Sequence, residues 1–257
     1  MSRRKAAAKQ EDEGVEVLTL ENFPFWVPTN AESIGVAGMK RKGKSALLKR
    51  WCAFLMEELP KQLPGWGVVA FDIHDEYSVL GHERDDCQLG PLPQRCVVEE
   101  FLGLLEEDPE ARVLFRRNLF LSLVTEDSGL DSAEVARQVR SALPHIRRRG
   151  KVICIFDEVG YYGHHIEESL RTVVACWGKD DVVPMFGTQG VTECPEPVRK
   201  QWTTLVSAKQ VKRSDLLFIK GQAGRAVALG IVGLEPKQYV NADLEDPAPE
   251  LLAALMQ

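Results

Sequence analysis

The chain of 257 residues carries a formal net charge of −6, and 44% of its residues are hydrophobic. This composition allows a sizeable core and argues against a basic protein that coats nucleic acid passively. No run approaches the ~20 consecutive apolar residues of a membrane span, and the six cysteines show no CxxC spacing and no histidine at metal-ligand distance. We therefore expect a cytoplasmic protein with reduced thiols that is not an integral membrane protein.

Strands and helices alternate along most of the chain. We expect residues 1–14 to be a disordered tail, residues 15–242 a single domain, and residues 243–257 an acidic C-terminal tail. The apolar runs predict strands over residues 33–37, 68–73, 118–124, 151–156 and 182–186. The spacing of apolar residues predicts helices over residues 44–59, ended by Pro60, over 97–105, and from Asp131 onward. Helices that alternate with nearly continuous apolar strands indicate a three-layer αβα fold with a mostly parallel central sheet.

Residues 38–45 form a complete GxxxxGK[ST] phosphate loop between a predicted strand and a predicted helix. In such a loop, backbone N–H groups and the positive end of the helix face phosphate oxygens. Lys44 would neutralise the β and γ phosphates, and the Ser45 hydroxyl would bind Mg²⁺. The expected nucleotide contacts are Gly38, Met39, Lys40, Arg41, Lys42, Gly43, Lys44, Ser45 and Ala46. The [NT]KxD motif that reads guanine is absent from the sequence, so we expect ATP as the nucleotide.

Two adjacent acids, Asp157 and Glu158, end the apolar run of residues 152–156. Asp157 is expected to hold Mg²⁺, and Glu158 to polarise the attacking water. Adjacent residues of a strand point to opposite faces, so only the turn after the strand can bring both acids to one site. Gln189 ends the next predicted strand, where its amide would contact the γ-phosphate or the water. Asp72 and Glu76, at another strand end, could contribute to the same crevice.

Two stretches are locally basic despite the negative net charge. Residues 131–151 and residues 196–220 each carry six basic side chains against two acidic ones. Each stretch could contact DNA phosphates, face a neighbouring subunit, or be an ordinary solvated surface.

Together the motifs resemble the HerA/FtsK superfamily of P-loop ATPases. The resemblance covers roughly residues 30–245 and depends on the phosphate loop, residues 71–77, the pair Asp157-Glu158, and Thr188-Gln189. It implies a RecA/ASCE-like fold and a homo-oligomeric ring, usually a hexamer, with ATP between subunits and double-stranded DNA in the pore. About thirty residues precede the phosphate loop, as in the minimal genome-packaging ATPases of internal-membrane viruses and phages. Such a motor would act in the host cytoplasm or at the packaging vertex of a virion, docked on a capsid or virion membrane protein.

The sequence departs from the family at the cation that a neighbouring subunit supplies to the nucleotide. The family usually places an arginine some ten residues before the Thr-Gln pair, where this chain has Lys179. Lys179 can replace the charge but not the bidentate geometry of arginine. Arg171, or one of the arginines 147–149, is the alternative.

Other functions fit the same motifs. A HerA-like translocase in DNA repair or conjugation would use the same core with a different partner. A small-molecule kinase would use the same loop, although the acid dedicated to water counts against it. A nucleotide-dependent assembly switch would bind ATP without hydrolysing it.

Overall fold

The computed structural model describes residues 15–77, 95–116, 119–124 and 131–244. Nine strands form one sheet in the order β1-β9-β8-β2-β7-β6-β3-β5-β4. All neighbouring strands from β8 to β4 pair in parallel, whereas β9 pairs antiparallel with both β8 and β1. The strands are β1 (Leu18–Thr19), β2 (Ile34–Ala37), β3 (Gly67–Asp72), β4 (Arg95–Val97), β5 (Phe120–Val124), β6 (Val152–Phe156), β7 (Val182–Thr188), β8 (Thr204–Ser207) and β9 (Gln238–Asp243). The expected αβα fold with a mostly parallel sheet is confirmed.

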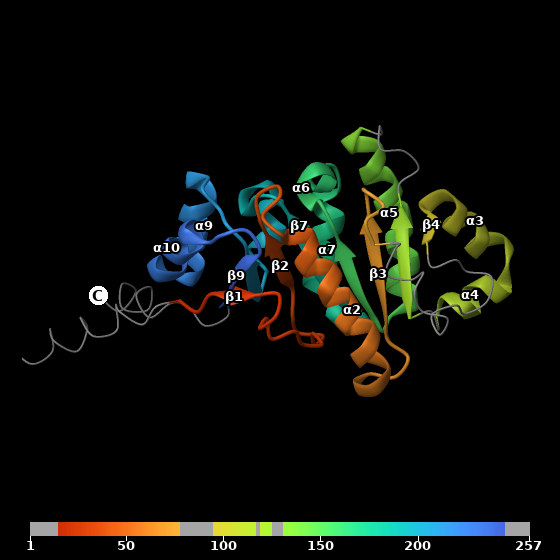
Figure 1. Ribbon diagram of the computed structural model, residues 1–257. Helices are drawn as coiled ribbons and strands as arrows, with labels where there is room; N and C mark the ends of the chain where they lie inside the picture. The colour runs from red at the N-terminus through yellow and green to blue at the C-terminus, as the bar shows by residue number, and fades with distance from the viewer. Residues whose placement is uncertain (1–14, 78–94, 117–118, 125–130, 245–257) are drawn as a thin grey trace, which may run out of the picture.

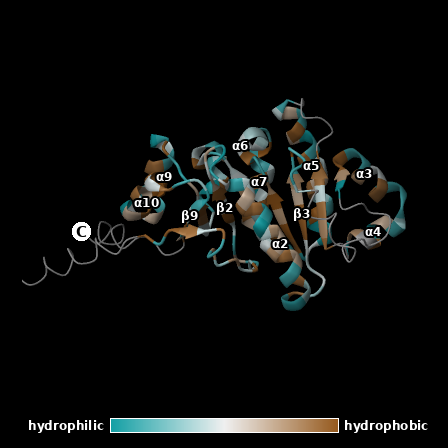
Figure 2. Cartoon of the chain, viewed as in Figure 1, coloured by the Kyte–Doolittle hydropathy of each residue, from teal (hydrophilic) through white to brown (hydrophobic). Residues whose placement is uncertain are grey.

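Helices cover both faces of the sheet (Figure 1). On one face lies α2 (Lys44–Gln62), together with the segment that precedes β2. The opposite face carries the remaining longer helices. These are α3 (Val98–Glu107), α4 (Pro109–Phe115), α5 (Ser132–Arg149), α7 (Glu167–Cys176), α9 (Arg213–Ala223) and α10 (Arg225–Gly233), with the short helices α6 (Val159–Tyr162) and α8 (Glu196–Arg199). Apolar residues are concentrated along the strands and on the inner sides of these helices (Figure 2).

The alternation of side chains along β6 explains why both faces need cover. Val152, Cys154 and Phe156 pack in the core on the side of α5 and α7. Ile153 and Ile155 pack in the core under α2. All five side chains are completely buried, as a strand with two covered faces requires.

A row of stacked rings crosses the sheet on the α5 side. The centroids of Phe71 and Phe156 lie 5.3 Å apart, those of Phe156 and Phe186 5.1 Å, and those of Phe186 and Trp202 6.4 Å. Trp202 ends the row over Gly35 of β2, where an added Cβ would lie 2.2 Å from the indole. Residue 35 must therefore be glycine for the Trp202 indole to pack against β2.

The segment before β2 forms an aromatic cover for α2 that sequence periodicity does not reveal. Phe23, Phe25 and Trp26 gather around Trp51, whose indole N–H donates to the carbonyl of Trp26 at 2.9 Å. β1, which precedes this segment in the chain, pairs with β9 as an edge strand.

Pro60 does not end α2, so that expectation is wrong. The helix continues to Gln62, and the N–H of Leu63 still reaches the carbonyl of Leu59 at 2.8 Å. The fixed φ of proline suits a helix, and the bond that it removes lies in the last turn, where its loss is least disruptive. The strand expected from residue 118 is found as β5 from Phe120, and the expected tails at 1–14 and beyond 244 lie outside the described residues. β9 extends through Asp243, the first residue of the expected acidic tail.

Candidate nucleotide-binding site

The phosphate loop is held by contacts with the ends of β8 and β9. Gly43 has φ +107°, a left-handed conformation that favours glycine. An added Cβ there would lie 2.5 Å from the hydroxyl oxygen of Tyr239, and this hydroxyl donates to the Gly43 carbonyl at 2.9 Å. The N–H of Met39 donates to the carbonyl of Lys209 at 3.3 Å, and that of Lys237 to the carbonyl of Lys42 at 3.0 Å. Hydrogen bonds within the protein thus fix the conformation of the loop.

A cavity of about 420 Å³ opens between this loop and the carboxyl ends of neighbouring strands. Most of the residues expected to contact nucleotide line it: Gly38, Met39, Lys40, Arg41, Gly43, Lys44, Ser45, Ala46, Glu158 and Gln189. His74, Glu76, Pro236 and Lys237 complete the lining. Lys42 contributes its backbone carbonyl to the bond with Lys237 and is not part of the lining. The motifs that lie far apart in the sequence therefore share one cavity.

The ammonium group of Lys44 lies between two carboxylates. It is bonded to Asp157 and lies 3.0 Å from Glu158 Oε1, and the lysine side chain is 5% exposed. Burial acts to lower the pKa of Lys44, but the two carboxylates outweigh it and raise the pKa above its usual value. Lys44 therefore stays charged although its side chain is almost fully buried.

The backbone turn after β6 directs both acids to the same cation. Glu158 adopts a left-handed conformation, with φ 50° and ψ 36°, so it leaves the alternation of the strand. Its N–H donates to Asp157 Oδ1 at 2.9 Å, which fixes that carboxylate. This is the turn that the sequence requires if two adjacent acids are to serve one site.

Gln189 holds the second oxygen of Glu158. Its amide nitrogen donates to Glu158 Oε2 at 3.2 Å, and the side chain of Gln210 donates to the carbonyl of Gln189 at 3.1 Å. The contact is possible because β7, which ends next to Gln189, lies between β2 and β6 in the sheet. The Gln189 amide therefore lies between the phosphate loop and the acidic pair.

Tyr77 and Asp72 form a buried support for Asp157. The hydroxyl of Tyr77 donates to Asp157 Oδ2 at 3.0 Å, and the tyrosine is completely buried. Asp72 does not line the cavity; its carboxylate accepts from the N–H of Glu76, the N–H of Tyr77 and the hydroxyl of Ser122. Burial raises the pKa of Asp72 in spite of these bonds. The sequence signature over residues 71–77 marked this turn, but not the bond from Tyr77 to Asp157.

The donor set suits magnesium. Within the described residues, no group of three or more His, Cys, Asp or Glu side chains could hold a metal by itself. Mg²⁺ is commonly bound by one or two carboxylates together with water and substrate phosphates, so it does not need such a group. Ser45 lines the cavity, and Asp157, which does not line it, is bonded to Lys44 at its edge; both residues carry oxygen atoms of the kind that Mg²⁺ prefers.

The candidate trans-acting cations lie away from this cavity. Lys179 lines a separate cavity beside η4 (Trp177–Asp180), before β7 begins. Arg171 on α7 lies 3.4 Å from Glu168 and is 58% exposed. Arg147 is paired with Asp180 at 2.7 Å. None of these three residues lines the cavity.

Fold and phosphate loop together define a RecA/ASCE-like P-loop NTPase fold. No family model matches the chain, and no curated protein sequence matches it. Among the described residues, no helix has the length and apolar character needed to cross a membrane.

Solved structures of viral genome-packaging NTPases match nearly the whole chain. The NTPase B204 of Sulfolobus turreted icosahedral virus 2 in complex with AMPPCP is 14% identical, with a TM-score of 0.59 over 86% of this chain and 96% of that chain. The DNA-packaging ATPase B204 from Sulfolobus turreted icosahedral virus is 15% identical, with a TM-score of 0.57 over 85% and 95%. At this identity the likeness shows the fold. The expected resemblance to genome-packaging ATPases is confirmed at the level of the fold.

Proposed function

We propose that this protein is a Mg²⁺-dependent ATPase that translocates double-stranded DNA and packages a viral genome into a preformed capsid. One observation carries the hydrolytic part: the phosphate loop and Glu158 line one cavity, where Lys44 and Gln189 both contact the Glu158 carboxylate. The fold shared with genome-packaging NTPases supports the choice of DNA as the substrate that is moved.

Each residue has a role that its contacts support. Lys44 neutralises the β and γ phosphates, and Ser45 and Asp157 hold Mg²⁺, which neutralises charge on the phosphates when bound. Glu158 accepts the proton of the attacking water, and Lys44 and Gln189 fix its two oxygens. Gln189 also senses the γ-phosphate in this proposal, because it lines the cavity and its amide donates to Glu158. This division leaves one acid for the metal and one for the water.

The ring that we propose, a hexamer, brings a basic side chain of the neighbouring subunit to the nucleotide. Lys179 and Arg171 are the candidates, since both lie outside the cavity of their own subunit. DNA in the pore would contact basic side chains of residues 131–151 or 196–220. Docking on a capsid or virion membrane protein completes the proposal.

The first test is ATP turnover with and without double-stranded DNA, at low and physiological salt, together with mass by light scattering. A ring-sized species whose turnover is stimulated by DNA, with a response weakened by salt, supports the motor. A monomer with turnover indifferent to DNA overturns it. Transfer of labelled phosphate to a metabolite would favour the kinase, and tight ATP binding without turnover would favour the switch.

The role of Glu158 is tested by Glu158→Gln, with Glu110→Gln on the exposed side of α4 as the matched control. Loss of a general base lowers the rate by about 10²–10⁴-fold. Glu158→Gln should therefore bind ATP normally and hydrolyse it at least about a hundredfold more slowly. Near-normal turnover would remove Glu158 from this role. Co-purification with a nuclease in place of a capsid would favour a repair or conjugation translocase.

A further inference from the structure

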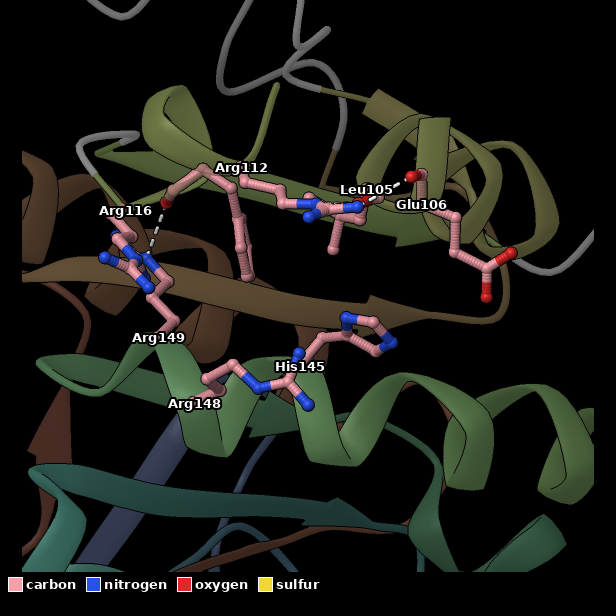
Figure 3. A pocket seen from close by; sticks show the side chains of 8 residues that line it. Leu105, Glu106, Arg112, Arg116, His145, Arg148 and Arg149 are labelled. Atoms are coloured by element: carbon pink, nitrogen blue, oxygen red, sulfur yellow. Dashed lines mark hydrogen bonds between the residues drawn. The ribbon is translucent and has the colours of Figure 1, made fainter. Parts of the chain in front are cut away.

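A second cavity, of about 320 Å³, lies between α3, α4 and the end of α5. Its walls contain four arginines and one histidine, and Glu106 is the only acid among the lining residues in the described part of the chain. The apolar lining is formed by Leu105 and Phe115. Figure 3 shows Arg116 and Arg149 together at one end of the pocket, the guanidinium of Arg148 beside His145, and the Glu106 carboxylate toward the other end. A chain of net charge −6 thus gathers positive charge in one concave place.

Two of these arginines are fixed by the backbone. Arg149 donates through Nε to the carbonyl of Phe115 at 2.7 Å, and its guanidinium lies 5.3 Å from the centroid of that ring. Arg112 donates to the carbonyl of Leu105 and, at 2.6 Å, to that of Glu106, at the end of α3. Both groups satisfy backbone acceptors and keep their full charge. They hold a positive potential in the cavity without neutralising it.

In the described part of the chain, the other two arginines have no acidic partner. Within the described residues, neither Arg116 nor Arg148 forms an ion pair, in contrast to Arg147, which is paired with Asp180. Burial lowers the pKa of Arg149 to about 10. Burial, and then the charge of Arg148, lower the pKa of His145. Arg148 and Arg112 thus disfavour a charge on His145, and a bound anion would offset the positive charge of the cavity.

This cavity is distinct from the nucleotide site. The two share no lining residue. The phosphate loop follows the carboxyl end of β2, whereas α5 ends at Arg149 just before the amino end of β6. Because β2 and β6 run in the same direction in the sheet, the two sites lie at opposite edges.

We propose that this cavity binds a small phosphate-bearing anion through Arg112, Arg116, Arg148 and Arg149. Arginine guanidinium groups match phosphate oxygens in planar, paired hydrogen bonds. The cavity is concave and of limited volume, which suits a free phosphate or pyrophosphate better than the backbone of a duplex. The proposal does not rest on the nucleotide site, because the two cavities share no lining residue.

The test is titration with pyrophosphate, followed by ³¹P NMR and calorimetry at constant ionic strength, in full-length Lys44→Ala protein. This background weakens the phosphate loop as a competing site and leaves the second cavity intact. Arg148→Gln and Arg116→Gln are then added one at a time; both side chains are exposed and outside ion pairs, so folding should persist. Arg137→Gln is the control, since it makes the same charge change on α5 at an arginine bonded to Glu134.

We expect pyrophosphate to bind the Lys44→Ala protein and to bind about tenfold more weakly after either cavity substitution, with little change for Arg137→Gln. Loss of binding with Lys44→Ala alone would assign the anion to the phosphate loop and overturn the proposal. Equal weakening by Arg137→Gln would show diffuse attraction and also overturn it. Displacement of pyrophosphate by a short duplex at physiological salt would identify DNA as the ligand and refute a small-anion site.

Discussion

Two buried tyrosines near the acidic pair give a direct measure of how firmly Asp157 is held. Tyr77 donates to Asp157 Oδ2 at 3.0 Å, and its ring is completely buried. Tyr77→Phe keeps the ring and removes the donor from a buried carboxylate. A hydrogen bond to a charged group contributes about 1.5–3 kcal/mol. Asp157 retains its bonds to Lys44 and to the N–H of Glu158. We therefore expect Tyr77→Phe to lower the free energy of unfolding by about 1.5–2 kcal/mol, the lower end of this range.

Tyr162 is the matched control. It is as deeply buried as Tyr77, but its hydroxyl has no hydrogen-bond partner among the described residues. Tyr162→Phe removes an unsatisfied polar group, so the free energy of unfolding should stay the same or rise by about 1 kcal/mol. Urea unfolding at pH 7 measures both variants, with unchanged m-values showing that only stability has changed.

Equal effects of the two tyrosine substitutions would refute the argument, since they would show that the bond from Tyr77 contributes nothing to stability. The kcat values of the same two variants show whether the hydrogen bond from Tyr77 to Asp157, rather than the packing of a buried ring, matters for hydrolysis. Tyr77→Phe should lower kcat because Asp157 is less well fixed, whereas Tyr162→Phe should leave kcat unchanged.

Three further predictions concern packing, titration and thiol reactivity. Gly35→Ala places a Cβ 2.2 Å from the Trp202 indole and should destabilise the fold by at least about 1–3 kcal/mol, whereas Gly221→Ala in α9, with nothing within 4 Å, should stabilise it by about 0.5–1 kcal/mol in thermal unfolding. Burial and the charges of Arg148 and Arg112 lower the pKa of His145, against an opposing effect of Glu106. The imidazole of His145 therefore binds a proton more readily in the unfolded chain than in the folded one. The free energy of unfolding should therefore fall as the pH drops through about 6.5, and His145→Gln should remove that part of the slope in urea titrations; an unchanged slope would contradict it. Cys176 is exposed, so a thiol reagent should label it in the native protein and Cys176→Ser should lose that label, while the buried thiols with raised pKa, Cys52, Cys154 and Cys194, should react only on unfolding.

The parts of the fold and site that the sequence predicts are those encoded by neighbouring residues. The phosphate loop, the acidic pair after β6 and the helix cap at Asp131 each lie within one short segment. Asp131 accepts from the N–H of Glu134 at 2.8 Å, as its spacing indicates. Order along the chain then brings strand ends to one edge, because the sheet is parallel. The central cavity follows from local patterns and this one topological rule.

The contacts that the sequence does not reveal join segments that are far apart. Tyr77 reaches Asp157 across 80 positions, and Tyr239 reaches Gly43 across 196. No periodicity marks such pairs, because each depends on the final packing of separate elements. β1 escapes prediction for another reason: its two residues are too few to show alternation, and pairing with β9 defines it.

The ion pair between Lys44 and the two acids sets a threshold on the charge of any ligand. A phosphate that enters the cavity competes with Asp157 and Glu158 for the same ammonium group. A ligand with one phosphate offers little more charge than the carboxylates already provide, whereas a triphosphate offers considerably more. We therefore expect the affinity for nucleotides to rise steeply from the mono- to the triphosphate, whatever the base. The number of phosphates would then determine which nucleotide binds.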